Sequence, residues 1–251
     1  ATLEAVHRFH RQFYHPGNAV LVLAGNLASD AAFQLADKWF GDIPAGPLSQ
    51  RHLPAEPAQK SSREKVVTAE VPLDALYLAF HIPARLDRGF YLADLFSDLL
   101  GGGASSRLYR RLHKQQQLFS TIDAYITGTV DPGLLVIEGK PSEGVDMERA
   151  KKAIWQELRL LQEQPLPPQE LQKLKHKVET NLLFSETSIL NKAISLAGFD
   201  MLGVPGQINE EVNLYRGIQA PELQQFAQQF LQPSRCNELQ YIASSETDLI
   251  Q

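Results

Sequence analysis

The sequence contains a single cysteine, Cys236, so the chain can form neither an internal disulfide nor a multi-cysteine metal site. Its longest apolar runs, such as residues 19–25, are far too short to cross a bilayer. It has no basic stripe, and its formal charge of −5 argues against binding to a nucleic-acid backbone. These absences exclude a disulfide-rich domain, a membrane span and a nucleic-acid partner.

The rest of the composition is that of a folded protein: 43% of the 251 residues are hydrophobic and 21% are charged, which is ample for a sizeable core. Apolar residues at helical spacing predict helices at 2–14 and 29–40, and the β-branched run between them predicts a buried strand at 18–25. Residues 41–63 are rich in Pro, Ser, Gln and Ala without periodicity, so we expect a linker there.

Beyond this linker, strand patterns come in pairs and are followed by a block of helix patterns. The sequence predicts further strands at 65–71, 75–82, 118–127, 134–139 and 238–243, and further helices at 88–100, 105–116, 146–164, 168–202, 208–218 and 220–231. A Pro-Leu-Asp turn joins the first two strands and a Val-Asp-Pro-Gly turn joins the next two. This order predicts an α+β fold of two layers, with helices packed on one face of an antiparallel sheet.

One helix–proline–strand pattern occurs twice at a constant spacing of 217 residues, which is 226 − 9, 230 − 13 and 233 − 16. The matching pairs are Phe9 and Phe226, Phe13 and Phe230, and Pro16 and Pro233. The repetition indicates a duplicated module whose closing element appears twice. Copies of equal length would place roughly 150 further residues before the first one.

Three segments follow one another in the order of one peptidase family. TLEAVHRFHRQFYHPGNAVLVLAGNL (residues 2–27) resembles the helix, Tyr-x-Pro-x-Asn turn and Gly-ended strand near the end of that family's first domain. ADKWFGDIP (36–44) resembles its Phe-Gly-x-Ile-Pro segment before the interdomain linker, and LLGGGASSRLYRRL (99–112) is similar to the Gly-Gly-Gly-x-Ser-Ser-Arg-Leu signature of its second domain. The chain therefore resembles the M16 (pitrilysin/insulinase-like) zinc metallopeptidases over most of its length.

The resemblance implies two related α/β domains that close around an unfolded peptide, with zinc held in the first domain by His-x-x-Glu-His and a distal Glu. On that basis residues 1–45 are the end of a first domain, 46–63 are the linker and 64–251 are a second, inactive-type domain. Zinc chemistry needs an open coordination position and a nearby Glu that activates water. We expect no metal or cofactor in this chain; zinc is expected in a preceding domain of the parent protein.

The family's second domain also supplies an Arg and a Tyr, seven positions apart, in Leu-Arg-Glu-x-x-Gly-Leu-Ala-Tyr. Residues 112–120 read LHKQQQLFS, so His113 stands in place of the Arg and Ser120 in place of the Tyr. Neither provides the fixed cation or the reach of that pair, so we expect no catalytic residue here. The candidates for lining a substrate chamber are Gly101, Gly102, Gly103, Ser105, Ser106, Arg107, His113 and Ser120.

Other chemistry is less favoured at these positions. The glycine loop joins two helices and has no Lys-Ser/Thr, so a tight reversal with a serine cap at 105 or 106 is preferred to a phosphate site. For Arg107, Arg110 and Arg111, whose periodic placement indicates an amphipathic helix, a solvated or ion-paired role is preferred. His7 and His10 lack a carboxylate at matching spacing, and after His176 and Glu179 the second imidazole position is Thr180. Both pairs therefore favour a polar helix face over a metal site.

The leading hypothesis is the C-terminal, inactive part of a zinc metalloendopeptidase that forms half of a chamber for unfolded peptides and has no activity alone. The alternative within the fold is a non-catalytic structural or partner subunit of a heterodimer, and a third possibility is an unrelated peptide-binding module. The expected partners are its own N-terminal zinc domain, a second M16 subunit in a homo- or heterodimer, and an unfolded peptide. We expect a soluble protein of a bacterial cytoplasm or periplasm.

Overall fold

The computed structural model describes residues 1–47 and 53–244. Two compact units make up the chain: the smaller combines Ala1–Pro57 with Thr180–Val212, and the larger combines Ala58–Glu179 with Asn213–Gln251. Helix α5 (Pro168–Ser185) begins in the larger unit and ends in the smaller one. Among the described residues, no helix is both long enough and apolar enough to cross a membrane.

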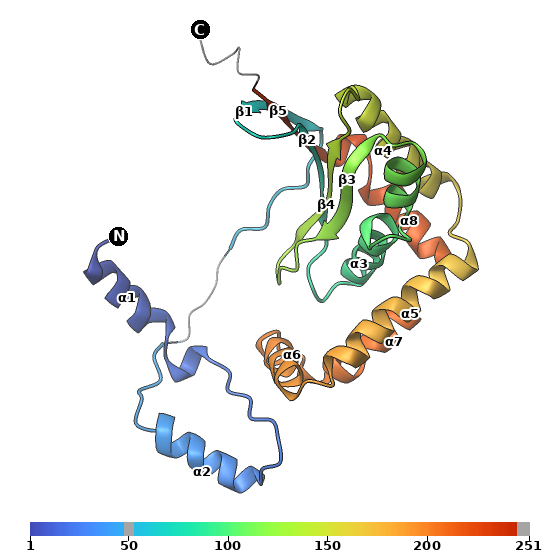
Figure 1. The fold of residues 1–251 in the computed structure, drawn as a ribbon. Helices are drawn as coiled ribbons and strands as arrows, with labels where there is room; N and C mark the ends of the chain where they lie inside the picture. Colours follow the sequence, from blue (N-terminus) through green and yellow to red (C-terminus); the bar gives the residue numbers. More distant parts are fainter. Residues whose placement is uncertain (48–52, 245–251) are drawn as a thin grey trace. The chain divides into compact units, whose positions relative to one another are not determined.

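A five-stranded sheet in the order β1-β5-β2-β4-β3 forms the centre of the larger unit (Figure 1). Its strands are β1 (Arg63–Ala69), β2 (Ala75–Ile82), β3 (Phe119–Ile126), β4 (Gly133–Pro141) and β5 (Cys236–Ala243). In β2, Leu76, Leu78 and Phe80 are fully buried, whereas the residues between them are partly exposed on the opposite face. Such alternation produces a sheet that is covered on one face only.

Helices cover the buried face of this sheet (Figure 1). The main ones are α3 (Arg88–Gly101), α4 (Met147–Glu163) and α8 (Ala220–Phe230), with the short elements α7 (Glu211–Arg216) and η4 (Pro233–Arg235) on either side of α8. The ring of Phe96 in α3 lies 5.8 Å from Phe226 in α8, and Trp155 in α4 meets Phe80 in β2 edge-on at 5.9 Å. The core of the larger unit therefore lies between the helix layer and the sheet.

The predicted α+β fold, with helices on one face of a sheet, is confirmed. The strand order differs from the one that the tight turns predict, because β5 lies between β1 and β2. β5 pairs parallel with β1 and antiparallel with β2, so the sheet is mixed rather than purely antiparallel. A short turn limits the distance between two strands, but it cannot reveal that a strand from the far end of the chain will be inserted between them.

Two predicted helices differ in detail from the structure. In the helix predicted at 105–116, Tyr109–Gln115 form a π-helix (η2), a rare backbone that depends on its tertiary surroundings and that residue patterns do not reveal. The helix predicted at 168–202 is divided into α5 and α6 (Ile189–Met201). Ser188 begins the second helix by accepting a hydrogen bond from the backbone N–H of Asn191.

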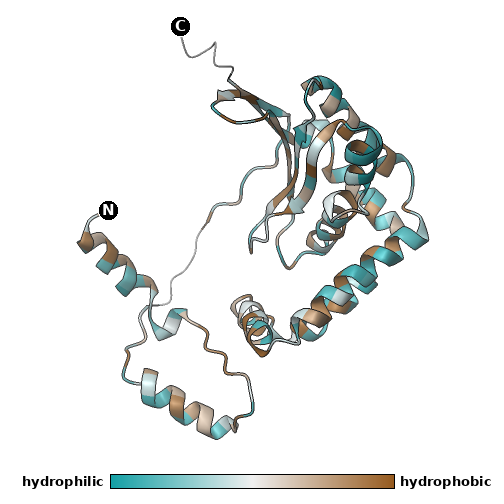
Figure 2. Cartoon of the chain, viewed as in Figure 1, coloured by the Kyte–Doolittle hydropathy of each residue, from teal (hydrophilic) through white to brown (hydrophobic). Residues whose placement is uncertain are grey.

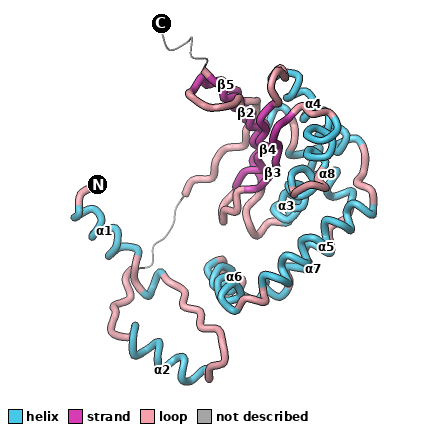
Figure 3. Tube along the Cα trace, in the orientation of Figure 1, coloured by secondary structure: helices cyan, strands magenta, loops and turns pink. Residues whose placement is uncertain are grey.

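The smaller unit is mainly helical. It contains α1 (Leu3–Phe13), η1 (Pro16–Asn18), α2 (Ser29–Phe40), α6 and η3 (Pro205–Asn209). The strand predicted at 18–25 is wrong, because residues 19–28 have no regular secondary structure (Figure 3). A strand needs partners for its backbone N–H and C=O groups, and no described strand pairs with this stretch.

Helices α1 and α2 contain hydrophobic segments (Figure 2), and several of their large apolar side chains are exposed to solvent. Leu3, Phe9, Phe33 and Trp39 are between 56% and 74% exposed. Thr2 is the N-cap of α1: its Oγ1 accepts a hydrogen bond from the N–H of Ala5 at 3.2 Å. Local sequence signals thus suffice to form these helices. No other described residues bury their apolar side chains.

In the sequence, the predicted linker follows α2 and precedes β1. Residues 48–52 of it fall outside the described part of the chain, and residues 53–62 form neither helix nor strand. β1 then begins at Arg63. The division into a first-domain end (1–45), a linker (46–63) and a second domain (64–251) stays a prediction.

Candidate functional site

The glycine triplet after α3 is required by the packing of the larger unit. A Cβ at Gly101 would lie 1.9 Å from the backbone nitrogen of Ala124 in β3, so only glycine allows this close approach. Gly103 has a φ of +99°, which supports the predicted tight reversal. The predicted serine cap is wrong: the Ser106 hydroxyl is buried without a hydrogen-bond partner among the described residues, and Ser105 Oγ accepts a hydrogen bond from Lys173.

Arg107 forms a two-point ion pair with Glu170 of α5, at 3.1 Å from Nε to Oε1 and 2.7 Å from the guanidinium to Oε2. Burial raises the pKa of Glu170, but the hydrogen bonds and charge of Arg107 outweigh it, so the pKa lies below its ordinary value. Both side chains are mostly buried. The guanidinium is therefore already engaged, and of the solvated and ion-paired roles considered for Arg107 the structure shows the second.

Two lysines on the same face of α5 hold the rest of this loop. Lys173 Nζ lies 3.3 Å from both the carbonyl oxygen and the hydroxyl of Ser105. Lys177 Nζ donates to Asp98 Oδ1 at 2.7 Å and to the carbonyl oxygen of Gly102 at 2.8 Å. Together with the Arg107 ion pair, these contacts fasten the segment 101–107 to α5. The loop therefore has a structural function in this unit, whether or not it also contacts a ligand.

His113 and Ser120 lie close together, at the end of η2 and the start of β3. The His113 Nδ1 is 2.8 Å from the carbonyl oxygen of Phe119, so Nδ1 carries the proton and donates to it. The His113 ring also lies 4.7 Å from the ring of Tyr109. Ser120 is exposed and donates to the carbonyl oxygen of Lys140 at 3.1 Å. Each side chain thus has a backbone partner, and their position on a chamber wall stays a prediction.

A cluster on the open face of the sheet is the feature that the sequence analysis missed. Tyr77 lies opposite Glu138, and its hydroxyl donates to Oε1 at 3.3 Å. Tyr125 lies near enough to Glu138 for that carboxylate to raise its pKa, and Tyr241 meets the Tyr77 ring edge-on at 6.2 Å. These four residues are called the open-face cluster below. Tyrosines at outward positions of three predicted strands were the signal that could have identified it.

Two tyrosines of this cluster, Tyr77 and Tyr125, keep their phenol protons at neutral pH. Burial and the neighbouring Glu138 carboxylate raise the pKa of Tyr77, and the same two causes raise the pKa of Tyr125. Tyr125 remains 42% exposed, so its ring is accessible from solvent. The cluster therefore combines an accessible aromatic surface with a carboxylate that accepts a hydrogen bond from Tyr77.

The described residues do not fit a zinc ion. They contain no group of three or more His, Cys, Asp or Glu side chains that could hold a metal. The nearest sequence candidate is already engaged, since Glu179 forms an ion pair with Arg216 and His176 hydrogen-bonds Gln172 at 2.6 Å. No step of a metal-dependent reaction can be assigned to this part of the chain.

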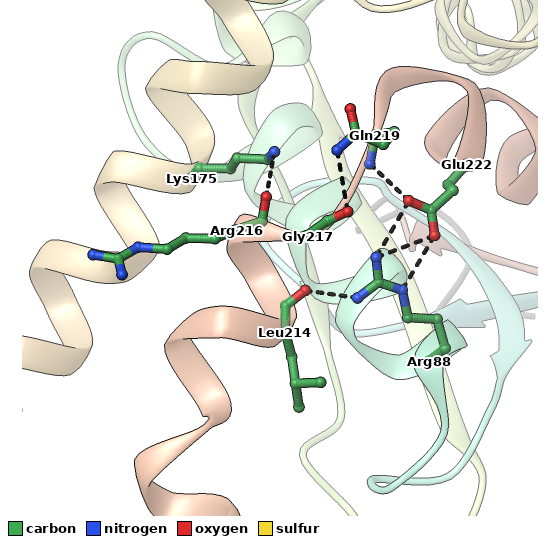
Figure 4. Close-up of polar contacts among 7 residues, drawn as sticks. All are labelled: Arg88, Lys175, Leu214, Arg216, Gly217, Gln219 and Glu222. Atoms are coloured by element: carbon green, nitrogen blue, oxygen red, sulfur yellow. Dashed lines mark hydrogen bonds and ion pairs between the residues drawn. The ribbon is translucent and has the colours of Figure 1, made fainter.

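A polar joint links the start of α3, the middle of α5, the end of α7 and the start of α8 (Figure 4). Arg88 pairs with both carboxylate oxygens of Glu222 and donates to the carbonyl oxygen of Leu214 at 2.6 Å. Lys175 donates to the carbonyl oxygen of Arg216 at 2.8 Å, where α7 ends. Each donor is used by a helix terminus, so this joint is structural rather than a ligand site.

The fold and its sites define an α+β domain with one open sheet face. Residues 1–178 match the family model described as the Peptidase M16 inactive domain, and the chain belongs to this family. The expected family and fold are thereby confirmed.

Individual relatives agree with this assignment. The chain is 28% identical over 179 residues to the zinc protease PqqE of Helicobacter pylori, an alignment that covers 69% of this chain and 40% of the relative. The crystal structure of a protease from Helicobacter pylori matches with a TM-score of 0.87 at 22% identity, covering 96% of this chain and 59% of that one.

The peptidase M16 inactive domain from Pseudomonas fluorescens matches with a TM-score of 0.83 at 20% identity, over 98% of this chain and 58% of that one. The chain spans between 40% and 54% of the length of the first two curated relatives.

Proposed function

We propose that this chain is the inactive-type half of an M16 zinc peptidase and forms one wall of a chamber for unfolded peptides. The observation that carries the proposal is the open-face cluster. Tyr77, Tyr125 and Tyr241 offer aromatic surface that contacts an extended chain without demanding one sequence, and Glu138 accepts hydrogen bonds. A peptide wall needs such contacts and no metal.

Zinc and its general base belong, in this proposal, to another domain of the same protein. The absence of a metal cluster from the described residues and the family description as an inactive domain both support it. Two of the relatives are named zinc proteases, one from Helicobacter pylori and one from Bacillus subtilis. Their names support the hypothesis that the whole protein is a zinc peptidase. The chain alone should therefore cleave no peptide.

The exposed helices of the smaller unit supply the surface for that other domain. The first copy of the repeated pattern, α1 and η1, corresponds at the 217-residue spacing to α8 and η4, after which β5 enters the sheet. By analogy, residues 19–26 become a strand when the sheet of a preceding domain provides partners on both sides. The uncovered apolar faces of α1 and α2 support this pairing, because burial against such a domain would remove them from water.

A second M16 subunit completes the site in this proposal. His113 and Ser120 replace the family's Arg and Tyr, so the partner supplies the donors that stabilise the oxyanion. Replacing both residues by Ala should then change peptidase activity of the assembled complex little. Replacing the partner's Arg and Tyr should cost roughly a hundred- to a thousandfold in turnover. A loss of similar size from the His113 and Ser120 variant would assign them a direct role.

The chamber wall is tested in the longest natural protein that contains this chain, assembled with its partner. Tyr77→Ala with Tyr125→Ala should raise KM for casein-derived peptides several-fold and leave kcat nearly unchanged, because uniform binding is lost. Tyr77→Phe with Tyr125→Phe keeps the rings and serves as the matched control. An unchanged KM in the alanine variant would contradict the wall.

The alternative function, a structural partner subunit without a peptidase site, predicts a different result. The assembled protein would then retain no stoichiometric zinc after dialysis and would cleave no casein peptide in any variant. The location of the whole protein, in the cytoplasm or the periplasm, is part of the same proposal. One structural relative, PqqL from Escherichia coli, is described as a periplasmic protease, which favours the second compartment.

A further inference from the structure

The helix layer of the larger unit stops short of one edge of the sheet. Strand register places Leu76 of β2, Gln240 of β5 and Val66 of β1 side by side on the face toward the helices. Exposure rises along this row, from 0% at Leu76 through partial exposure at Gln240 to 62% at Val66. Within the described residues, β1 and the end of β5 therefore lack the cover that the helices give to β2, whereas Cys236 and Glu238 at the beginning of β5 are buried.

The uncovered strip is about one helix wide. Neighbouring strands lie about 4.8 Å apart, so two strands span about 10 Å, close to the diameter of an α-helix with its side chains. A cavity of about 870 Å³ adjoins this strip, between α4 on one side and Glu64, Cys236 and Glu238 at the beginning of β1 and β5 on the other. Trp155, Pro233 and Cys236 give it apolar surface. We call this cavity the α4 groove.

The wall formed by α4 is cationic. Lys152, Trp155 and Arg159 follow one another at i, i+3 and i+7, a spacing that places them on one helix face, and Arg149 also lines the groove. Within the described residues, the side chains of Lys152 and Arg159 take part in no hydrogen bond or ion pair. This wall is positive although the whole chain has a formal charge of −5.

The carboxylates of the groove are mostly neutralised from within. Lys151 Nζ lies 2.7 Å from Glu148 and 2.9 Å from Glu238, and Glu238 is only 7% exposed. Glu64 on β1 is the remaining acidic side chain of the lining. The lining thus holds four cationic side chains, Arg149, Lys151, Lys152 and Arg159, against the three carboxylates of Glu64, Glu148 and Glu238. One positive charge remains, and it lies on the α4 wall, which a ligand with negative charge complements.

The groove is suited to binding rather than to catalysis. The one thiol in its lining is that of Cys236. Burial, followed by the charge of Glu238, raises the pKa of this thiol to about 12, so it stays protonated and unreactive at neutral pH. Apolar floor, open helix-wide shape and one charged wall are features of a protein-docking surface.

We propose that the α4 groove docks an amphipathic α-helix of a partner protein. The apolar face of that helix covers Val66 and Trp155, and acidic residues along one flank pair with Lys152 and Arg159. The occupant is helical because the strip has the width of one helix and continues the layer of α3, α8 and α4. This surface is separate from the open-face cluster, which lies on the opposite face of the sheet, so it adds a function to the proposed chamber wall.

A designed peptide serves as the probe, since isolated short helices are marginal in water. A stapled helix of about 14 residues, with leucines on one face and glutamates on one flank, should bind the 251-residue chain with a Kd on the order of 10 µM by calorimetry. The same peptide with lysines in place of the glutamates should bind at least tenfold more weakly. Added salt should weaken the first interaction, because partly exposed charges are screened.

Charge reversal identifies the surface. Lys152→Glu with Arg159→Glu should weaken binding of the glutamate peptide at least tenfold and strengthen binding of the lysine peptide. The matched control is Arg110→Glu with Lys114→Glu, which makes the same charge change at exposed residues of η2 outside the groove. It should leave both affinities within about twofold. Circular dichroism verifies the fold, and Lys152→Gln with Arg159→Gln replaces the reversal if that variant unfolds.

Three results would overturn the proposal. The glutamate peptide could fail to bind at concentrations up to about 1 mM, far above the expected Kd. The two peptides could bind equally, or the groove reversal and the η2 control could have the same effect. Binding of tripolyphosphate with the same dependence on Lys152 and Arg159, together with failure of the peptide, would identify a small-anion site instead. None of these results bears on the chamber wall, which is tested by peptide cleavage.

Discussion

Two segments of this chain share a local structure and differ in their surroundings. The early segment, residues 2–27, contains α1 and then η1; the late segment, residues 219–243, contains α8, η4 and β5. Adding 217 to the bounds of α1 (3–13) and η1 (16–18) gives the bounds of α8 (220–230) and η4 (233–235). The repeated helix and turn that the sequence predicted are confirmed, while their origin in a duplication stays a prediction.

The difference between the two segments lies in what covers them. The ring centroids of Phe9 and Phe13 lie 4.7 Å apart, as do those of Phe226 and Phe230. Yet Phe9 is 56% exposed and Phe226 only 2%. The late segment continues into a strand with neighbours on both sides, whereas the early one continues into irregular chain. Local sequence thus suffices for the helix and the turn, but the strand depends on partners.

The largest expected contrast concerns these phenylalanines. Phe226→Ala should lower the free energy of unfolding by about 3–5 kcal/mol, because it leaves a cavity against Phe96 and Phe230. Phe9→Ala, its counterpart, should change the stability of the 251-residue chain by less than about 0.5 kcal/mol. Urea unfolding of both variants measures the difference. Equal losses would mean that the early helix is packed as firmly as the late one in solution.

Proline tests the strands in the same way. Leu239→Pro should cost about 3 kcal/mol or more, because it removes a backbone donor from β5, which pairs on both sides. Val22→Pro, at the position 217 residues earlier, should cost little, since no described strand pairs there. In a longer protein that includes a preceding domain, Val22→Pro should become costly as well. A persistent lack of effect there would contradict the proposed strand at residues 19–26.

The helix starts give a smaller contrast. Glu222 accepts a hydrogen bond from the N–H of Gln219 at 2.7 Å and pairs with Arg88, so Glu222→Ala should cost about 1–2 kcal/mol. Glu222→Gln keeps an acceptor for the cap but loses the charge, and about half of the cost should remain. Thermal unfolding followed by circular dichroism compares the variants. If both substitutions cost the same, the charge pair rather than the cap holds this helix start.

These contrasts also explain which features the sequence could predict. The helix starting after Thr2 and the glycine reversal at residues 101–103 depend on neighbours within a few positions, and both are present. The insertion of β5 between β1 and β2 depends on a strand from the other end of the chain, so turn patterns missed it. The strand predicted at 18–25 has the right composition and no partner.

Part of the candidate site could be predicted from the sequence and part could not. The substitution of the family's Arg and Tyr by His113 and Ser120 is visible in the sequence, because it needs only the flanking pattern. The open-face cluster could have been found from tyrosines at alternate strand positions. The ion pair between Arg107 and Glu170 joins residues 63 positions apart, and no local pattern indicates it.

The smallest expected effect is a gain in the early segment. Its N-cap, Thr2, already accepts a hydrogen bond from the N–H of Ala5, the position that corresponds to Glu222. Ala5→Glu would complete a capping box and place a negative charge in the first turn of α1, which should stabilise this helix by about 0.3–1 kcal/mol. Global unfolding would hardly register this change, so amide hydrogen exchange of residues 6–10 is the suitable measurement. Exchange should slow by up to about fivefold, since 1.4 kcal/mol corresponds to a factor of ten.

Ala5→Gln, which offers the reciprocal hydrogen bond without the charge, should give part of the gain. Unchanged exchange in both variants would mean that the start of α1 is not limited by its cap, and that the two segments differ already in their helices.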